Sequence, residues 1–594
     1  MKDKLKALRG LMKGHGVGAY LVPSTDPHQS EYVPEFWKRR KFMTGFTGSA
    51  GDALITLDKA GLWTDSRYFL QAERELRGSG FTLFRWGKPG VPSWQEWIAK
   101  ELRLGQALGL DPKLITHRDF AKLKKELERR EILLKAIEKN LVDVIWTQKP
   151  APPAGGISIH EKKYAGESIR SKLERLRQKM TEEGVDAHVL TQLDAIAWLF
   201  NIRGSDVEFN PVAIAYALVT RKRAALFIGK EKVTPSVRRI LARDAKIEDY
   251  ENFSRRLLEL RQRKLRVWLD EAGVSEWVVR CLGRETVLIF KPSPVHLFKA
   301  VKNKTEIASA KKAHLRDGAA MVKFLCWLEK EAAKGGVTEL SAARKIEDLR
   351  RPQDLFQGLS FKTISSYGSH GAIVHYAVSP ETDIALRPEG IYLIDSGSQY
   401  LDATTDITRT ICLGKPREEQ RDRFTRVLKG LIALTRVSFP QGTFGPQIDI
   451  LARLALWKKG LNYGHGTGHG VGAYLNVHEG PQSIAPSRGF GVSLEPGMIT
   501  SVEPGYYKEN EYGLRVENMV LVVKDKAKSN EAFSFYTFET LTLCPIDLKL
   551  VRKDLLTAEE ARWLNTYHRK VREGLTPCLA SAEAAWLKKA TQPL

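Results

Sequence analysis

The first half of the chain repeats one pattern of hydrophobic and polar positions. A charged amphipathic segment is followed by a short apolar run at residues 16–22, and the same order recurs before residues 184–190. An aspartate stands ten residues after the first glycine of each run, Asp26 and Asp194. Amphipathic helices that alternate with short buried strands indicate α/β architecture. The pattern therefore predicts two related α/β domains.

Two breaks in the pattern divide the chain into three predicted domains. Residues 149–160, KPAPPAGGISIH, are rich in proline and glycine and separate helical from strand patterns. A second break falls near residues 291–307, before a long helical pattern. We expect two α/β domains over 1–148 and 161–298, and a third, α+β domain with more alternating strands over 301–594.

Composition supports a multidomain globular protein. A chain of 594 residues is too long for one core, and its 43% hydrophobic content is ordinary. No apolar run approaches the roughly 18 residues that cross a bilayer, so no membrane association is expected. The N-terminal segment is basic, its apolar residues are interrupted by charged ones, and no small-residue cleavage site follows. This pattern indicates an amphipathic helix and not a signal peptide.

Cysteine usage favours a reducing compartment. The cysteines are odd in number, dispersed and without a CxxC pair, so the sequence indicates neither a disulfide framework nor a thiolate zinc site. We therefore expect a cytoplasmic protein. The five positions are Cys281, Cys326, Cys412, Cys544 and Cys578.

The net charge of +24 raises the question of nucleic-acid binding. However, lysines and arginines are interleaved with glutamates in segments such as 121–140, as on solvated helix faces with i,i+4 pairs. No zinc finger, RNP-like motif or basic tail is present in the sequence. No nucleic-acid partner is expected.

A predicted hairpin in the third domain carries two aspartates. Residues 391–395 form an apolar strand that ends at Asp395, and residues 404–413 alternate so that Asp406 shares a face with threonines. A turn near residues 400–401 would set Asp395 opposite Asp406. Two like charges about 5 Å apart are destabilising unless a positive charge lies between them. The alternative is that both face water.

A second predicted hairpin repeats this arrangement with glutamates. One strand ends at Glu503 and the next begins near residue 514, so a centre near residue 510 places Glu503 opposite Glu517. Arg515 is the nearby cation, but the alternation predicts that its side chain points the other way. Two such pairs in one domain suggest a bound cation.

A glycine-rich stretch, NYGHGTGHGVGAYLNVHEG at residues 462–480, supplies a nitrogen ligand, His469. Four carboxylates and one imidazole suit two divalent ions, Mn²⁺ or Co²⁺ better than Zn²⁺, although Zn²⁺ stays possible. Two metals about 3.5–4 Å apart can hold a bridging hydroxide and polarise a carbonyl, as in metal-assisted hydrolysis. No GxGxxG or GxxxxGK[ST] pattern is completed, which argues against a phosphate loop.

Three further histidines lie near the proposed ligands. A lone histidine is more often an ordinary polar residue than a functional one. His465 and His478 flank His469, and His375 follows an apolar strand near the first hairpin. Their positions make them candidates for binding substrate.

These residues closely resemble the aminopeptidase P family, Xaa-Pro aminopeptidases of the pita-bread metallopeptidase fold, in its long three-domain cytosolic form. The resemblance covers nearly the whole chain and implies two creatinase-like domains before the catalytic domain. It is carried by HYAVSPET, YLIDSGSQYLDATTDITRT, YGHGTGHGVGAYLNVHEGP, EPGYY, GLRVENMVLV, PSTDPHQSEY, GFTGSAG, WTDSRYFLQA, AIAWLFNIRGSDVEFNPV and KGGVTELSAA.

The resemblance implies a role for each candidate residue. Asp406 and Glu517 would bridge two metals, and Glu503 would also take a proton from the nucleophilic water. His375 and His478 would bind substrate, with His478 at the scissile carbonyl or its oxyanion, and His465 would line the proline pocket. The implied metal ligands are Asp395, Asp406, His469, Glu503 and Glu517, and the further substrate-binding or supporting residues are Arg67, Tyr507 and Arg515.

The implied reaction removes the N-terminal residue before a penultimate proline, with a metal-bridged hydroxide as nucleophile, and the resemblance implies a homodimer. A prolidase limited to Xaa-Pro dipeptides, or a methionine aminopeptidase, would use the same five ligands. The two extra domains and their motifs favour aminopeptidase P. An inactive relative that binds histone or RNA would typically have lost metal ligands, and here all five are present.

Overall fold

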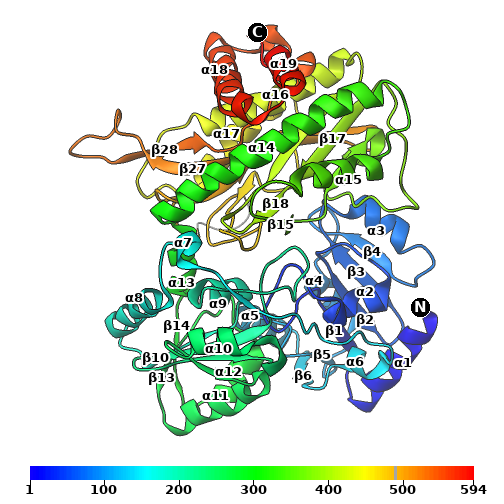
Figure 1. Ribbon diagram of the computed structural model, residues 1–594. Coiled ribbons are helices and arrows are strands. Elements are labelled where there is room, and N and C mark those ends of the chain that lie inside the picture. The colour runs from blue at the N-terminus through cyan, green and yellow to red at the C-terminus, as the bar shows by residue number, and fades with distance from the viewer. Residues whose placement is uncertain (487–490) are drawn as a thin grey trace. The chain divides into compact units, whose positions relative to one another are not determined.

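The computed structural model describes residues 1–486 and 491–594 and separates into two compact units (Figure 1). The first unit contains Met1–His160 and Glu167–His296, and the second contains Glu161–Gly166 and Leu297–Leu594. No helix in the described ranges is long and apolar enough to cross a membrane. All five cysteines are free thiols.

The first unit contains two six-stranded sheets with the same strand order. The first is β4-β3-β2-β1-β5-β6, and the second is β12-β11-β10-β8-β13-β14. In each, the strand that follows the first helix is antiparallel to one neighbour and parallel to the other: β1 lies between β2 and β5, and β8 lies between β10 and β13. The predicted relation between the two α/β domains is thus confirmed at the level of topology.

The strands of the first sheet are β1 (Ala19–Val22), β2 (Asp52–Thr56), β3 (Ala60–Thr64), β4 (Thr82–Arg85), β5 (Ala107–Leu110) and β6 (Leu133–Ala136). Those of the second are β8 (Ala187–Leu190), β10 (Ala215–Thr220), β11 (Ala224–Ile228), β12 (Lys246–Glu248), β13 (Arg266–Leu269) and β14 (Val287–Phe290). A separate short ladder joins β7 (Ser158–Ile159) to β9 (Ile202–Arg203).

The helix before each central strand is amphipathic, as the pattern predicts. In α1 (Lys2–Gly14), Leu5, Leu8 and Met12 are buried. In α8 (Ile169–Glu182), the inner face includes Leu173, Leu176 and Met180. This spacing of three and four places each set on one side of its helix. The other helices of this unit are α2 (Arg39–Thr44), α3 (Phe69–Glu75), α4 (Trp94–Glu101), α5 (His117–Glu128), α6 (Leu141–Ile145), α9 (Leu193–Leu199), α10 (Pro235–Leu241), α11 (Phe253–Gln262) and α12 (Glu276–Leu282).

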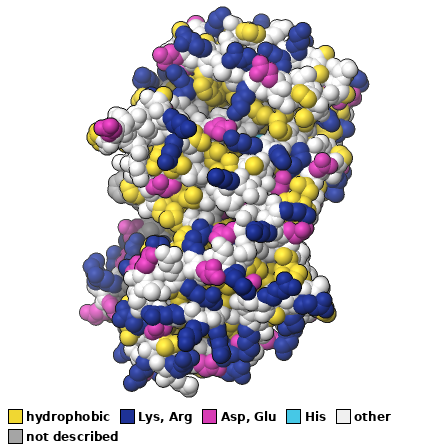
Figure 2. Space-filling view, turned by 60° about the vertical axis from the view of Figure 1, so that its left-hand side comes forward, with side chains coloured by type: hydrophobic (Ala, Val, Ile, Leu, Met, Phe, Trp, Pro, Cys, Tyr) yellow, Lys and Arg dark blue, Asp and Glu magenta, His cyan; other side chains and the backbone are white. Residues whose placement is uncertain are grey.

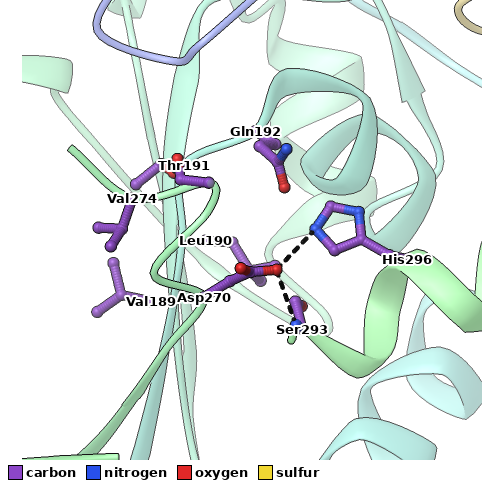
Figure 3. Close-up of a pocket in the computed structure, with 9 residues that line it drawn as sticks. Val189, Leu190, Thr191, Gln192, Asp270, Val274, Ser293 and His296 are labelled. Carbon is purple, nitrogen blue, oxygen red and sulfur yellow. Dashed lines mark hydrogen bonds and ion pairs between the residues drawn. The ribbon is translucent and has the colours of Figure 1, made fainter. Parts of the chain in front are cut away.

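A small polar pocket lies at the end of β13 (Figure 3). Asp270 accepts a hydrogen bond from Ser293 N at 3.0 Å and lies 3.6 Å from His296 Nε2. At the matching end of β5, Asp111 accepts from Asn140 Nδ2 at 3.0 Å. In both sheets the aspartate thus holds the loop that follows the edge strand. Because this aspartate contact recurs in both sheets, we interpret it as a structural feature of the duplicated fold.

The second unit combines several sheets with long helices. Its helix α14 (Lys304–Ala332) begins with a capping box between Asn303 and Glu306. Helices α16 (Glu418–Thr435) and α17 (Gly445–Trp457) pack against each other and contribute Leu428, Leu431 and Ala452 to the main hydrophobic core. The remaining helices are α7 (Lys162–Ala165), α15 (Glu339–Arg350), α18 (Ala558–Leu575) and α19 (Ser581–Ala590), and α13 (Pro294–Ala300) spans the division between the units.

The described strands of the second unit form the four-stranded sheet β21-β28-β27-β24, the three-stranded sheets β16-β17-β20 and β15-β18-β19, and two-stranded ladders. The bounds outside the two carboxylate hairpins are β15 (Phe356–Leu359), β16 (Ile364–Tyr367), β21 (Phe439–Pro440), β22 (Gly468–His469), β23 (Ser483–Ile484) and β28 (Phe535–Thr540).

Surface charge is dispersed on the face that Figure 2 shows. Lysine and arginine side chains are spread over it and are interrupted by aspartate and glutamate. The distribution on this face agrees with the interleaved charges of the sequence.

Candidate metal centre

The first carboxylate hairpin has a different register from the predicted one. Strand β17 (Ile391–Ser396) pairs with β20 (Ile407–Cys412), and Asp395 lies opposite Thr408, not Asp406. The reason is that β18 (Ser398–Tyr400) leaves this ladder and pairs with β15 and β19 (Ala403–Thr404). Asp406 lies between β19 and β20, outside the ladder. The predicted direct pairing of Asp395 with Asp406 is therefore wrong.

The second hairpin has the predicted register. Strand β24 (Ile499–Val502) pairs with β27 (Asn518–Lys524), and β25 (Gly505–Lys508) pairs with β26 (Tyr512–Arg515). In these ladders, Val502 lies opposite Asn518, and Gly505 lies opposite Arg515. The two ladders share one register, so the same pairing extends over the residues that lie between them. Glu503 and Glu517 consequently face each other there, as predicted.

Three candidate ligands from separate elements converge. The ligand atoms of Asp406, His469 and Glu517 all lie within 4.8 Å of one another. His469 Nε2 is 3.4 Å from Asp406 Oδ2 and 3.5 Å from Glu503 Oε1. The other ring nitrogen of His469, Nδ1, lies 3.0 Å from the Gly470 carbonyl, an arrangement that leaves Nε2 to face the carboxylates.

The carboxylates of this cluster are buried together. Burial, followed by the charge of Asp395, raises the pKa of Asp406 well above its ordinary value, and burial and Asp406 do the same to Glu517. Burial also raises the pKa of Glu503 to about 7, although His469 and Arg515 oppose the shift. Shared burial of several acids is costly unless protons or cations neutralise them.

Acceptor atoms without hydrogen-bond partners also fit a cation-binding site. Within the described ranges, Asp395 Oδ1 and Asp406 Oδ1 are buried and accept no hydrogen bond. Buried polar atoms normally have partners. Carboxylate oxygens and one imidazole nitrogen form a donor set that suits divalent Mn²⁺, Co²⁺ or Zn²⁺. The residues therefore fit a metal centre.

Arg515 points toward this cluster, contrary to the prediction. Its side chain is almost fully buried, and Nη2 donates to Asp395 Oδ2 at 2.6 Å while Nη1 donates to Tyr507 OH at 2.7 Å. A buried guanidinium requires acceptors, and Asp395 supplies one. Asp395 thus has a protein counter-ion, which the sequence argument did not foresee.

The histidines and Arg67 occupy different surroundings. His465 Nε2 lies 2.8 Å from Tyr507 OH, and the ring centres of His478 and His469 are 4.3 Å apart. His375 follows Val374, whose carbonyl accepts from Arg515 at 3.4 Å. Arg67 belongs to the other unit, where its guanidinium makes two hydrogen bonds with Asp65.

Hydroxyl groups that the sequence analysis did not assign support the acids. Thr408 Oγ1 donates to Glu517 Oε2 at 2.8 Å, and Ser501 Oγ donates to Glu503 Oε1 at 3.3 Å. Ser501 Oγ also accepts from His469 N at 3.0 Å. The strand alternation that places Thr408 two residues after Asp406 was the available signal for the first contact.

Comparison with known proteins places these features in families. Models described as Creatinase/Prolidase N-terminal domain match residues 4–138 and 148–306. Metallopeptidase family M24 matches residues 308–524, and the C-terminal region of peptidase_M24 matches residues 534–594.

Similar sequences span the full length. A probable Xaa-Pro aminopeptidase P from Coprinopsis cinerea is 43% identical over 100% of this chain and 98% of its own. One from Neosartorya fischeri is 41% identical over 100% of this chain and 92% of its own.

Solved structures show similarity to the same kinds of protein. An X-prolyl aminopeptidase from Caenorhabditis elegans, described as a cytosolic enzyme with a di-nuclear active site, matches with 37% identity and a TM-score of 0.96. The match covers 100% of this chain and 99% of that one. A Xaa-Pro dipeptidase from Bacillus anthracis is 23% identical with a TM-score of 0.51, over 64% of this chain and 99% of its own, and shares the fold.

Proposed function

The chain belongs to the Xaa-Pro aminopeptidase P family, whose catalytic domain is that of metallopeptidase family M24, and we propose that it hydrolyses the bond between an N-terminal residue and a penultimate proline. The observation that carries this proposal is the convergence of Asp406, His469 and Glu517, beside Glu503 and Asp395. The first unit supplies the two creatinase-like domains, and we retain 1–148, 161–298 and 301–594 as the proposed domain boundaries.

Two divalent ions would be held by five residues, of which Asp406 and Glu517 would be shared between the ions. The five are Asp395, Asp406, His469, Glu503 and Glu517. Mn²⁺ is our first choice, and Co²⁺ and Zn²⁺ are the alternatives. The di-nuclear centre of the C. elegans protein supports the number of ions. Such ions activate water and polarise the scissile carbonyl.

Glu503 would accept the proton of the attacking water. Its Oε1 lies 3.5 Å from His469 Nε2, so the carboxylate stands beside the proposed metal ligands, within reach of a water held there. Ser501 Oγ donates to Glu503 Oε1 and orients the carboxylate. Glu503 is therefore the proposed general base.

The other candidate residues would bind the peptide. A proline amide has no N–H and a fixed φ, so a selective site must fit the ring and not the missing donor. His465 and Tyr507 would form a wall of that pocket, because they contact each other beside the acids. His478 would stabilise the carbonyl oxygen. His375, Arg67 and Arg515 are the remaining proposed substrate-binding or supporting residues.

An exposed apolar face on α17 supports the proposed homodimer. Ile450, Leu454 and Trp457 are each about 45% exposed and, at spacings of four and three, lie on one side of the helix. Isologous association would cover such a face. Sedimentation should show a dimer, and Leu454→Asp should shift it to monomer; a monomeric wild type would reject the proposal.

A cytoplasmic location is proposed as well. The C. elegans relative is described as cytosolic, and the free cysteines suit a reducing compartment. Fractionation of the source cells would test it, and recovery outside the cytosol would reject it.

The substrate proposal has a direct test. Purified enzyme supplied with Mn²⁺ should release the N-terminal residue from Xaa-Pro-Yaa tripeptides, and Glu503→Gln should abolish this release while the protein stays folded. Cleavage confined to Xaa-Pro dipeptides would instead identify a prolidase. Failure to cleave any Xaa-Pro peptide would reject both.

A further inference from the structure

One buried arginine holds the loop that leads from α17 to His469. Arg453 is 3% exposed, and its Nη1 donates to the Tyr463 carbonyl at 2.8 Å while Nη2 donates to the His465 carbonyl at 2.8 Å. The guanidinium also lies 4.0 Å from the centre of the Tyr463 ring. A planar fork of donors can hold two carbonyl groups at once, which a lysine ammonium on its flexible stem does not reproduce.

Asp449 fixes the arginine and the far end of the same loop. Its carboxylate accepts from Arg453 Nε at 2.6 Å and from Thr467 Oγ1 at 2.6 Å. Thr467 Oγ1 is also 2.6 Å from Tyr463 OH, and the Thr467 carbonyl accepts from Glu503 N at 2.8 Å. One turn of α17 therefore ties down both ends of residues 463–467.

His465 lies in the middle of this loop. Its Nδ1 is 2.7 Å from the Gly466 carbonyl and its Nε2 is 2.8 Å from Tyr507 OH. The orientation of the ring thus depends on the backbone that Arg453 holds. Displacement of a binding group by about 1 Å can cost up to about 10²-fold in turnover efficiency.

We propose that Arg453, held by Asp449, is a positioning residue that sets His465 against Tyr507 and thereby determines the affinity for the penultimate proline. The inference rests on the proposed function. Arg453 itself contacts backbone and Asp449, and it acts through His465.

The test compares Arg453→Lys with Arg426→Lys. The control is matched, because Arg426 on α16 also pairs with an aspartate four residues earlier, Asp422, and also donates to a backbone carbonyl, that of Ala455 on α17. Its contact does not involve the histidine loop. For Xaa-Pro-Yaa peptides, Arg453→Lys should raise KM about tenfold and change kcat less than about threefold, since the ligands of the metal are untouched.

The same variants give a readout without substrate. Amide hydrogen exchange in residues 461–467 should be about tenfold faster in Arg453→Lys and unchanged in Arg426→Lys, because only the first loses the contacts to the Tyr463 and His465 carbonyls. If wild-type enzyme cleaved no Xaa-Pro peptide, the proposed function would fail while this measurement still tested the positioning role. Equal exchange and equal KM in both variants would overturn the inference, as would a loss confined to kcat.

Thr467→Val provides a second variant that retains Arg453. It removes the hydroxyl that joins Asp449 to Tyr463 and should raise KM in the same direction, by about threefold. If Arg453→Lys fails to fold, this variant decides, and an unchanged KM contradicts the proposal.

Discussion

The two hairpins that carry the carboxylates differ in how their charge is balanced. In the first, Asp395 pairs directly with Arg515, and its partner strand presents Thr408 instead of a second acid. In the second, Glu503 and Glu517 face each other and are supported by hydroxyl groups and His469. The first hairpin therefore gives Asp395 a protein cation and leaves Asp406 for a metal, whereas the second leaves both of its acids for a metal to neutralise.

The largest effect is expected from Glu517→Gln. Loss of a shared ligand should lower kcat/KM by at least about 10³-fold and reduce the bound metal, because several kcal/mol of electrostatic stabilisation depend on the ions. Activity assays with metal analysis would measure both. Glu509→Gln, at the exposed tip of the same hairpin, is the control and should behave as wild type. A Glu517→Gln enzyme with a tenth of normal activity would contradict the assigned role.

Arg515→Met should remove the counter-ion of Asp395 in the first hairpin. Asp395 would then be buried without its cation, so we expect the metal-free protein to lose about 3–5 kcal/mol of stability. Glu517→Gln should not destabilise the metal-free protein in this way, because it removes a carboxylate of a crowded cluster. Denaturant unfolding after chelation would compare the two. Equal losses of stability in the two variants would show that the two hairpins do not differ in how their carboxylate charge is neutralised.

The metal-free protein should lose stability as pH rises. Burial raises the pKa of Glu503 from 4.5 to about 7, so between these pH values the folded state binds a proton that the unfolded state has released. Stability is fully present below pH 4.5 and falls as pH rises through 7. Thermal unfolding across this window should show the decline after chelation and a weaker one with metal, which replaces the protons. A rise in stability over the same window would be inconsistent with uncompensated acids.

The smallest effect is expected from Tyr507→Phe. Its hydroxyl connects Arg515 of the balanced pair to His465, but the ion pair of Arg515 with Asp395 remains. Loss of such hydrogen bonds is worth about 1 kcal/mol, or a change of up to about tenfold in kcat/KM. Tyr506→Phe is a suitable control on the neighbouring position. A loss as large as that of Glu517→Gln would assign Tyr507 a direct chemical role.

Local sequence was sufficient where the chain stays within one pattern. The relation between the two α/β domains is visible in the runs at 16–22 and 184–190, since amphipathic helix and buried strand follow from spacing alone. The register of Glu503 and Glu517 was also predictable, because the ladders on both sides of these residues share one register set by a single turn.

Distant contacts decided the rest. The segment 398–400 pairs with β15, which lies about forty residues earlier, and this detour moves Asp406 out of register with Asp395. Arg515 turns toward Asp395 because a buried guanidinium needs a carboxylate partner. The alternation of residues along a strand does not reveal this requirement.

By itself, the sequence determined the duplicated α/β domains, the second hairpin and the residue types of a divalent metal centre, because each depends on local periodicity or on motif chemistry. Only the tertiary structure decided which acid has a protein counter-ion and which buried helix residue holds the histidine loop. Asp395 and Arg515 are 120 residues apart, and the hydrogen bonds of Arg453 run across a turn to main-chain carbonyls that carry no sequence signal. Such contacts arise from packing, where burial makes every unpaired charge costly.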